Sequence, residues 1–419
     1  MLQRRYFDNA ATSFPKPPAV AAAVHRFMTE LGASGRGVYT EAREAGRTIH
    51  RCRQRIARLV NLPTPEGVIF GYNTTDALNL AVKGTLGYLR RISGSSRRLH
   101  VVSTDMEHNS ILRPLNAALA RDPAVEWTKV NADPATGLVD PGDLRAAIRP
   151  GQTVLVCVNH ASNVTGAQQD LAALGRVCGE FGAGSGDDGL LLLVDGAQSL
   201  GHVPVDMRAA NIDLLAFPGH KGLLGPQGTG GLCIRPGVEK RLDTIREGGT
   251  GNISEVQTHP ETMPEKYEAG SHNAAGIAGL SEGVAWLLER GIDRVREHEV
   301  TLMRPLLDFL ASDQATGLRL IGSPDVRTRV GVFSVVHDSL TPAELAMVLE
   351  AQHGLLTRAG LHCAPLAHSA FGTAPPRGQG ATRLSLGPFL TLADVEFACA
   401  ALAGVCREHC APHAASGVT

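Results

Sequence analysis

Short, continuously apolar segments alternate along this chain with segments of helical periodicity, and this alternation restricts the fold more than any other feature. The apolar segments typical of strands occupy residues 67–72, 99–104, 153–160, 190–198, 212–219 and 230–235. Between them lie helical patterns at residues 76–89, 110–121 and 170–182. Strands that are apolar on both faces and alternate with helices predict an α/β fold with a mostly parallel, doubly covered sheet.

The pattern changes after about residue 265. Residues 274–291 predict a long helix, and the segments that follow it predict a smaller α/β unit. A chain of 419 residues is also too long for a single small core. We therefore expect a large domain over residues 15–264 and a small domain made of residues 1–14 and 265–419.

Charge and hydropathy argue against several classes of function. The formal net charge is −1, which gives no support for nucleic acid or an anionic membrane as the main partner. No apolar run approaches the roughly 20 residues needed to span a bilayer. Residues 1–12 lack the apolar stretch of a secretory signal. We therefore expect a globular protein of the cytoplasm.

The eight cysteines are scattered along the chain. Several lie in apolar segments, as Cys157 does, so we expect reduced and mostly structural thiols. Residues 406–413 (CREHCAPH) contain metal-binding side chains, but no second ligand pair at zinc spacing accompanies them. We expect no metal site and interpret this stretch as the end of the last helix.

Polar residues follow the predicted strands, where the carboxyl ends of parallel strands meet at one edge of a sheet. These residues are Thr74, Thr75, His108, Asn163, Asp195, Gln198, His220 and Lys221. A carboxylate that ends a buried strand, as Asp195 does, is costly without a cationic partner. The hydroxyl residues Thr74 and Thr75 open a helix and offer an anion site. Each residue alone has a structural explanation as a cap or turn, but together they describe a pocket with an anion site, a carboxylate, an imidazole and a lysine.

Such a pocket has the parts that pyridoxal phosphate requires. A lysine forms the Schiff base, and a carboxylate pairs with the pyridinium nitrogen. A helix N-terminus holds the phosphate, and a polar amide contacts the ring hydroxyl.

A set of motifs in a fixed order carries a more specific resemblance. In chain order they are YFDNAATSFPKP, GYNTTDALNLA, DMEHNSI, SNVTGA, VDGAQSLGHVPVD, FPGHKGLLGPQGTGGL, YEAGSHN, TRAGLHCAP and RLSLGPFLT. This set resembles the class V, fold-type I pyridoxal-phosphate enzymes, and within them the cysteine desulfurases and selenocysteine lyases. The resemblance covers nearly the whole chain. It implies a large domain with a mostly parallel seven-stranded sheet, a smaller α/β C-terminal domain and a homodimer.

The resemblance assigns roles to the residues at the strand ends. Lys221 would be the Schiff-base lysine, and Asp195 would pair with the pyridinium nitrogen. His108 would stack on the cofactor ring and take part in catalysis. Gln198 and Asn163 would contact the ring hydroxyl or the substrate carboxylate.

The phosphate contacts also follow from the resemblance. Thr74, Thr75 and His220 would hold the phosphate. Ser271 matches a position that reaches the phosphate from the other subunit. Pro218 stands where the family usually has Ser or Thr, so one phosphate contact is missing.

Substrate binding and sulfur transfer are assigned in the same way. Arg383 matches an arginine that clamps the substrate carboxylate, a task that suits a bidentate guanidinium, and Arg36 matches a further active-site arginine. Cys363 matches the persulfide-forming cysteine of the second group of cysteine desulfurases. Arg358 and His362 lie near it in sequence and would favour its thiolate.

The function implied is conversion of L-cysteine into L-alanine, with transfer of sulfur to Cys363 as a persulfide and then to an unknown sulfur acceptor. Selenocysteine lyase, acting on L-selenocysteine, stays open as an alternative. Another class V aminotransferase or a cysteine lyase on the same fold is also open, although Cys363 argues against both. A non-catalytic sulfur carrier would not need Lys221, Asp195 and His108 together.

Overall fold

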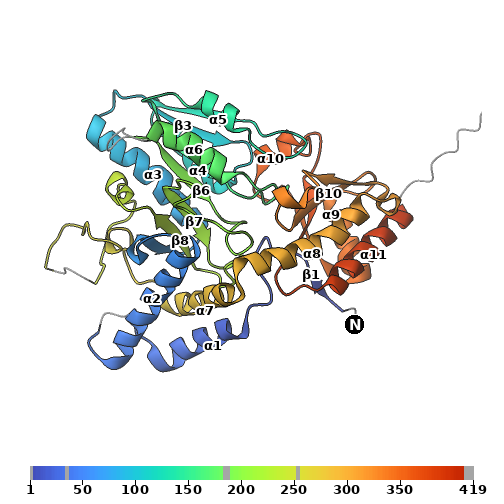
Figure 1. Ribbon diagram of the computed structural model, residues 1–419, viewed down its shortest axis with the longest axis horizontal. Coiled ribbons are helices and arrows are strands. Elements are labelled where there is room, and N and C mark those ends of the chain that lie inside the picture. The colour runs from blue at the N-terminus through green and yellow to red at the C-terminus, as the bar shows by residue number, and fades with distance from the viewer. Residues whose placement is uncertain (1–2, 34–36, 183–188, 252–254, 410–419) are drawn as a thin grey trace, which may run out of the picture.

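The structure is a computed structural model that describes residues 3–33, 37–182, 189–251 and 255–409. It consists of a large unit built on a seven-stranded sheet and a smaller unit built on a four-stranded sheet, which lie side by side (Figure 1). The predicted α/β fold with a large, mostly parallel sheet is confirmed. Among the described helices, none combines the length and the apolar character that a membrane crossing demands.

The large sheet brings the ends of most of its strands to one edge. Its strands are β2 (Val68–Gly71), β3 (Leu99–Thr104), β4 (Val125–Val130), β5 (Thr153–Asn159), β6 (Leu191–Asp195), β7 (Leu214–Pro218) and β8 (Gly230–Ile234). Their spatial order is β2-β8-β7-β6-β5-β3-β4, and β8 runs antiparallel to both of its neighbours while the other pairs are parallel. The other six strands therefore point the same way, and their carboxyl ends share an edge.

Within the large sheet, the edge strand β4 is the one that no apolar run in the sequence predicted. Its two end residues, Val125 and Val130, are buried, but the residues between them are half-buried or exposed. In contrast, every residue of β3, β5, β6 and β7 is buried. A partly solvated edge strand lacks the continuous apolar run by which the central strands were recognised.

Helices cover both faces of the large sheet. They are α1 (Pro18–Arg26), α2 (Thr40–Leu59), α3 (Thr74–Ser93), α4 (Asn109–Arg121), α5 (Pro141–Ala147), α6 (Leu171–Gly182) and α7 (Ala274–Arg290). Helix α7 packs against α1 and α2, and its Leu280 and Val284 share a core with the large sheet. We keep residues 15–264 and residues 1–14 with 265–419 as proposed domains, with α7 as the part of the second domain that packs on the first.

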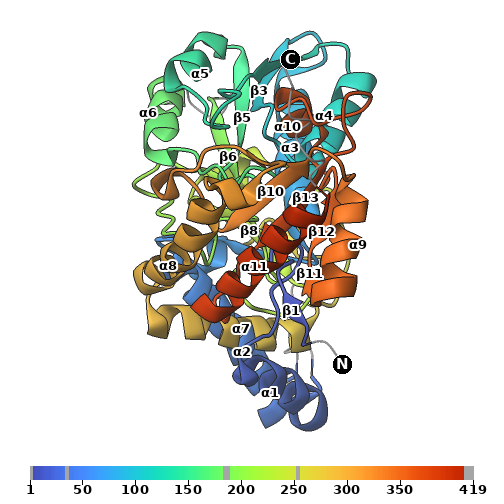
Figure 2. The same cartoon turned by 90° about the vertical axis from the view of Figure 1, so that its right-hand side faces the viewer.

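The small unit is built from residues of both the N-terminal and the C-terminal part of the chain. Its elements are β1 (Arg5–Tyr6), α8 (Ile292–Leu310), β9 (Leu318–Ile321), β10 (Val332–His337), α9 (Pro342–His353), β11 (Leu355–Leu356), β12 (Arg358–Gly360), α10 (Pro365–Ala370), β13 (Ala381–Ser385) and α11 (Leu392–His409). The sheet order is β12-β13-β10-β9, and β1 pairs with β11. Helix α11 lies across the face of this sheet that is turned away from the large unit (Figure 2).

A buried ion pair anchors the segment that carries Ser271 to the large unit. Arg53 of α2 donates a hydrogen bond to Glu268 at 2.7 Å, and both side chains are buried. Glu268 also accepts the backbone N–H of Phe70 at 2.6 Å and lies 3.3 Å from His272. Burial alone would raise the pKa of the Glu268 carboxyl, but Arg53 and His272 hold it below its ordinary value. Glu268 is therefore charged at neutral pH and ties its segment to α2 and β2.

Replacing Arg53 with methionine should destabilise the fold strongly, because Glu268 would then be a buried charge without its main partner. We expect a loss of about 3–5 kcal/mol in the free energy of unfolding, measured by urea denaturation. Arg145→Met is the matched control, since Arg145 pairs with Glu180 on the surface, and it should cost no more than about 1 kcal/mol. Equal losses in the two variants would contradict a special role for the buried pair.

Candidate active site

Lys221 and Asp195 lie at the carboxyl ends of the neighbouring parallel strands β7 and β6. Asp195 is buried and Lys221 is half-buried, and both line one pocket. Removal from water lowers the pKa of Lys221 to about 8, against the opposing effect of Asp195. Burial raises the pKa of Asp195, while the Ala197 N–H, at 3.0 Å, and the charge of Lys221 favour its ionised form. The pair therefore combines a lysine that loses its proton readily with a carboxyl that needs a cationic partner.

The N-terminal segment holds the backbone on which Lys221 sits. The carbonyl of His220 accepts hydrogen bonds from Thr12 Oγ1 at 3.0 Å and from Lys16 Nζ at 2.7 Å. It also accepts the backbone N–H of Ser13 at 3.1 Å, and Ser13 Oγ donates to the carbonyl of Lys221 at 2.8 Å. Thr12, Ser13 and Lys16 all lie in the first of the ordered motifs, from which no role was predicted for them.

The glycine after Lys221 is explained by a close backbone approach. A Cβ atom on Gly222 would overlap the carbonyl oxygen of Leu200, and one on Gly201, whose φ is +88°, would overlap the backbone of Gly222. The loops that follow β6 and β7 therefore touch backbone to backbone beside the lysine. This contact fixes the position of Lys221 relative to Asp195.

The first turn of α3 forms the anion-binding end of the pocket. Asn73 is the N-cap, and its side chain accepts the N–H of Asp76 at 2.9 Å. Thr74 and Thr75 are the first two helical residues, and their N–H groups have no partner within the helix. These N–H groups, the helix dipole and the Thr75 hydroxyl all favour an anion. His220 also lines this pocket, and its Nδ1 atom is buried without a hydrogen-bond partner among the described residues.

His108 is a neutral imidazole in this site. Burial first, and then the charge of Lys221, lower the pKa of His108 to about 4. Its Nδ1 atom accepts the backbone N–H of Ser110 at 3.1 Å as the N-cap of α4, so the ring proton is on Nε2. The hydroxyl of Ser110 lies 2.8 Å from that of Thr75, which connects α4 to the anion-binding end.

Asn163 and Gln198 complete the wall of the pocket. Gln198 Nε2 donates to the carbonyl of Ala10 at 2.9 Å. Asn163 Nδ2 donates to the carbonyl of His362, and its Oδ1 atom is buried without a described partner. An anion site, a buried carboxylate, a lysine and an unpaired amide oxygen fit a phosphorylated pyridine aldehyde with a ring hydroxyl.

Arg383 is buried in β13 and reaches the same region from the small unit. It forms an ion pair with Asp8 at 2.9 Å and donates to the carbonyl of Asn163 at 3.1 Å. Its Nε atom is buried and has no partner in the described part of the chain. Arg358 lies directly opposite Arg383 in the β12–β13 register. Asp8 lies in the motif YFDNAAT, from which no role was predicted for it.

Cys363 lies on a strained loop at the mouth of the site. Both His362 and Cys363 have positive φ angles, +50° and +59°, which side chains other than glycine rarely adopt. The Cys363 carbonyl accepts the N–H of Asn109 at 2.8 Å, which fastens the loop to the start of α4. The thiol is exposed, and it lies close enough to Lys221 to influence the pKa of that lysine.

The prediction that His362 favours a thiolate at Cys363 is wrong. His362 is buried, and burial lowers its pKa to about 2, so that the ring is neutral at neutral pH. It packs against His368 with the ring centroids 5.6 Å apart. A neutral imidazole supplies no positive charge, so of the two residues expected to favour the thiolate, only Arg358 is a cation.

Glu107 is a buried carboxyl for which the sequence pattern predicted no role. Its Oε1 atom accepts the Thr104 hydroxyl at 2.8 Å and the backbone N–H of Asn159 at 3.0 Å. Burial, and to a smaller degree the nearby Asp195, raise the pKa of Glu107 to about 8. The side chain is therefore largely protonated at neutral pH and adds little negative charge beside Asp195.

Some predicted residues are not brought together within one chain. Ser271 is exposed and does not line the pocket around Lys221. Arg36 and residues 410–413 lie outside the described residues. Cys406 is buried in α11, and the described ranges contain no group of three or more side chains placed to hold a metal ion.

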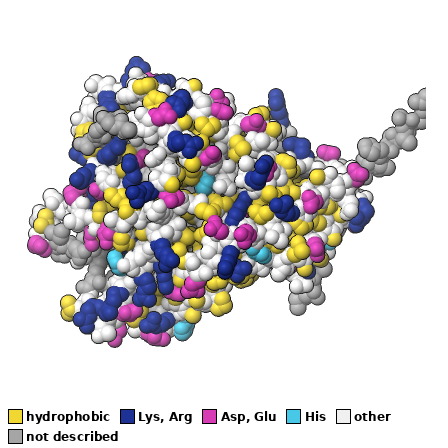
Figure 3. Space-filling view, in the orientation of Figure 1, with side chains coloured by type: hydrophobic (Ala, Val, Ile, Leu, Met, Phe, Trp, Pro, Cys, Tyr) yellow, Lys and Arg dark blue, Asp and Glu magenta, His cyan; other side chains and the backbone are white. Residues whose placement is uncertain are grey.

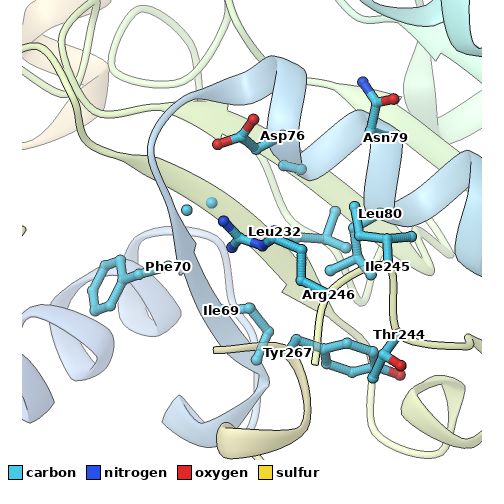
Figure 4. Close-up of a pocket in the computed structure, with 13 residues that line it drawn as sticks. Ile69, Phe70, Asp76, Asn79, Leu80, Leu232, Thr244, Ile245, Arg246 and Tyr267 are labelled. Carbon is cyan, nitrogen blue, oxygen red and sulfur yellow. The ribbon is translucent and has the colours of Figure 1, made fainter. Parts of the chain in front are cut away.

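A separate cavity of about 330 Å³ lies beside the edge strand β2 and helix α3. In Figure 4, Asp76 and Asn79 of α3 lie on one side of it and Thr244 and Tyr267 on the other. Its lining includes none of the side chains around Lys221.

On the face shown in Figure 3, basic and acidic side chains are interspersed, in keeping with the net charge of −1.

Proteins with similar sequences include several named cysteine desulfurase. Residues 5–397 match the family model for aminotransferase class-V. A probable cysteine desulfurase of Methanothermobacter thermautotrophicus is 34% identical over 87% of this chain and 86% of its own length. A cysteine desulfurase of Yersinia pseudotuberculosis is 31% identical over 93% of this chain and 90% of its own.

Solved structures agree with the sequence comparison. The apo cysteine desulfurase of Thermococcus onnurineus superposes with a TM-score of 0.85 at 28% identity, covering 96% of this chain and 94% of that one. The cysteine desulfurase CsdA of Escherichia coli, in an S-sulfonic acid form, gives a TM-score of 0.82 at 25% identity, covering 97% and 95%. The resemblance noted in the sequence is thus confirmed.

The raised pKa of Glu107 leads to a test of stability against pH. Its carboxyl has an ordinary pKa of 4.5 in the unfolded chain and about 8 in the folded chain, so its contribution to stability is full below pH 4.5 and is lost as the pH rises through 8. Glu107→Gln keeps the accepted hydrogen bonds but does not titrate. We expect the free energy of unfolding of the variant, relative to that of the natural protein, to rise by up to about 1.4 kcal/mol per pH unit between pH 5 and 8. The measurement is urea denaturation of the cofactor-free chain.

Asp122→Asn provides the control for this measurement. Burial would raise the pKa of Asp122, but hydrogen bonds from Arg90 and from the Ala124 N–H hold it below its ordinary value, and neither donor titrates between pH 5 and 8. That carboxyl is charged in both states above pH 5, so the difference between this variant and the natural protein should not change over the same range. A pH-independent difference for Glu107→Gln as well would contradict a neutral Glu107.

Proposed function

This chain belongs to the aminotransferase class-V family, and on that premise we propose that it is a pyridoxal-phosphate-dependent cysteine desulfurase. The reaction converts L-cysteine into L-alanine and leaves the sulfur on Cys363. The observation that carries this proposal is the position of Cys363. Of the seven cysteines in the described residues it is the exposed one, and it lies at the mouth of the site that contains Lys221.

The residues around Lys221 would hold the cofactor. The first N–H groups of α3, at Thr74 and Thr75, would bind the phosphate together with His220. Asp195 would pair with the ring nitrogen, which would give this buried carboxylate a cationic partner. The neutral ring of His108 would lie against the cofactor.

Two amides line the remaining wall of the site. Asn163 and Gln198 would contact the ring hydroxyl, and the unpaired Oδ1 atom of Asn163 makes it the better placed acceptor. Pro218 offers no hydroxyl to the phosphate, so Thr75 and His220 carry more of that interaction.

Lys221 is suited to move a proton. When bound, pyridoxal phosphate serves as the electron sink for the charge that develops on the substrate Cα atom. Because its pKa is about 8, Lys221 is partly neutral near neutral pH and can take the proton from Cα. The cationic side chains of Arg383 and Arg358 favour this neutral form, since both lower the pKa of Lys221.

Arg383 would bind the carboxylate of the amino acid. Its ion pair with Asp8 fixes the orientation of the guanidinium, and the buried Nε atom, which has no partner among the described residues, would donate to a substrate oxygen. Arg358 adds a second positive charge beside it. Arg36, which lies outside the described residues, is kept as a proposed substrate contact.

Cys363 would take the sulfur from the substrate. Its thiolate attacks the substrate sulfur, so that an S–S bond forms while the C–S bond of the substrate breaks. The electron pair of the broken bond returns to the carbon skeleton, which takes up protons and leaves as alanine. Cys363 is left as a persulfide. The loop, with its two positive φ angles, would hold the exposed thiol within reach of the substrate.

Variants of Lys221 and Cys363 separate binding of the cofactor from sulfur transfer. Lys221→Ala should lose both the visible absorbance of the cofactor and all alanine formation. Cys363→Ser should keep the absorbance and lose sulfide and alanine production from L-cysteine by about 100-fold or more. The assay measures alanine, pyruvate and sulfide together.

A matched thiol provides the control. Cys399 is a half-buried cysteine in α11, and Cys399→Ser should retain full activity. Undiminished cysteine turnover in Cys363→Ser would contradict the assignment. Pyruvate in place of alanine would indicate a cysteine lyase, and activity limited to selenocysteine would indicate a selenocysteine lyase.

We also propose that the enzyme is a homodimer in which Ser271 reaches the phosphate of the other subunit. Within one chain Ser271 is exposed and away from the pocket, although Glu268 anchors its segment firmly. Sedimentation should give twice the mass of one chain. Ser271→Ala should weaken cofactor binding about tenfold, the effect of losing one hydrogen bond to a charged group, as measured by equilibrium dialysis. A monomeric holoenzyme, or unchanged affinity, would contradict this proposal.

A further inference from the structure

A second pocket opens on the outer side of Cys363. It has a volume of about 380 Å³ and shares Thr75, His108 and Ser110 with the pocket around Lys221. Cys363 itself lines this outer pocket. The residue thus lines the outer pocket and is also close enough to Lys221 to influence the pKa of that lysine.

Two helices form the walls of the outer pocket. Thr75, Asn79 and Lys83 are spaced four residues apart and so lie on one face of α3. Arg113 comes from α4, which packs against α3. The N–H of Asn109, at the start of α4, holds the Cys363 carbonyl at 2.8 Å, so the loop and the pocket wall are fixed to each other.

The charged side chains that line this outer pocket are all positive. Its ten lining residues include the cations Lys83 and Arg113 and no carboxylate. Both cations are exposed, and neither forms an ion pair with a described residue. The residues one helical turn away from each, among them Asn79 and Asn109, are not acidic. The two positive charges are therefore available to an anion that approaches Cys363 from outside.

We propose that the outer pocket receives the sulfur acceptor and that the acceptor is a small thiol carrying negative charge. This inference rests on the proposed function, because it needs a persulfide on Cys363. The volume lies within the range of small-molecule sites, about 300–1,000 Å³. The unpaired Lys83 and Arg113 match an acceptor that carries one or two carboxylates.

The transfer step is balanced without a further reagent. The acceptor enters as a thiolate and attacks the outer sulfur of the Cys363 persulfide. A new S–S bond forms on the acceptor, and the S–S bond to Cys363 breaks with its electron pair on the Cys363 sulfur. The acceptor leaves as a persulfide, and Cys363 returns as the thiolate that the next cycle uses.

Single-turnover discharge of the persulfide tests the proposal. The holoenzyme is loaded with L-cysteine and freed of excess amino acid, and the persulfide on Cys363 is verified by alkylation and mass spectrometry. Three thiols of similar size are then compared: 3-mercaptopropionate, 2-mercaptoethanol and cysteamine. Rate constants for persulfide loss are corrected for the thiolate fraction of each. We expect the anionic thiol to be fastest and the cationic one slowest, with the difference shrinking in high salt.

Variants of the two cations test whether the preference for the anionic thiol arises in the outer pocket. Lys83→Met and Arg113→Met should each slow discharge by 3-mercaptopropionate about threefold, the effect of one exposed charge, and leave 2-mercaptoethanol unchanged. Lys83→Arg should retain the preference. Arg121→Met, at the far end of α4, is the matched control and should have no effect.

The outcomes separate this inference from the function on which it rests. Equal rates for the three thiols, or a charge preference that survives both substitutions, would overturn the assignment of the pocket. So would a persulfide that forms on Cys363 but is discharged by no small thiol, which would favour a protein acceptor. If L-cysteine leaves no persulfide on Cys363, the proposed function itself fails.

Discussion

The charged pair at the ends of β6 and β7 is the feature on which the rest of the site depends. Asp195 and Lys221 carry opposite charges at a place with little water, an arrangement that is costly unless their positions are fixed. The parallel pairing of the two strands sets their separation. The backbone contact between Gly201 and Gly222 fixes the two loops, and the hydrogen bonds that converge on the His220 carbonyl hold the backbone next to the lysine.

The small unit supplies the two groups that we propose to act on the substrate. Cys363 and Arg383 both come from it, while Lys221 and Asp195 belong to the large sheet. The two sets are joined by direct contacts, since Asn163 donates to the loop of Cys363 and Arg383 donates to the carbonyl of Asn163. A site divided in this way requires the two units to be correctly docked before any chemistry can occur.

The degree of burial determined how well each element and residue was predicted. The central strands were found because continuous apolar runs leave a clear pattern, whereas the partly solvated strand β4 has no such pattern. The motifs placed Lys221 and Asp195 at strand ends. They did not indicate that Asn73 caps α3 or that Glu107 is a neutral carboxyl, because cap geometry and burial depend on neighbours distant in the chain.

The sequence alone determined the α/β class, the strand ends that carry polar residues and the family resemblance, because these depend on residue order and local periodicity. Only the tertiary structure decided which ionisable side chains are charged and which of the charged ones have a partner. It gave His362 a neutral ring, provided Arg383 with Asp8 as a partner and left Lys83 and Arg113 unpaired beside Cys363. The physical reason is that a pKa and an ion pair depend on desolvation and on distances across the fold, and the chain order encodes these only indirectly.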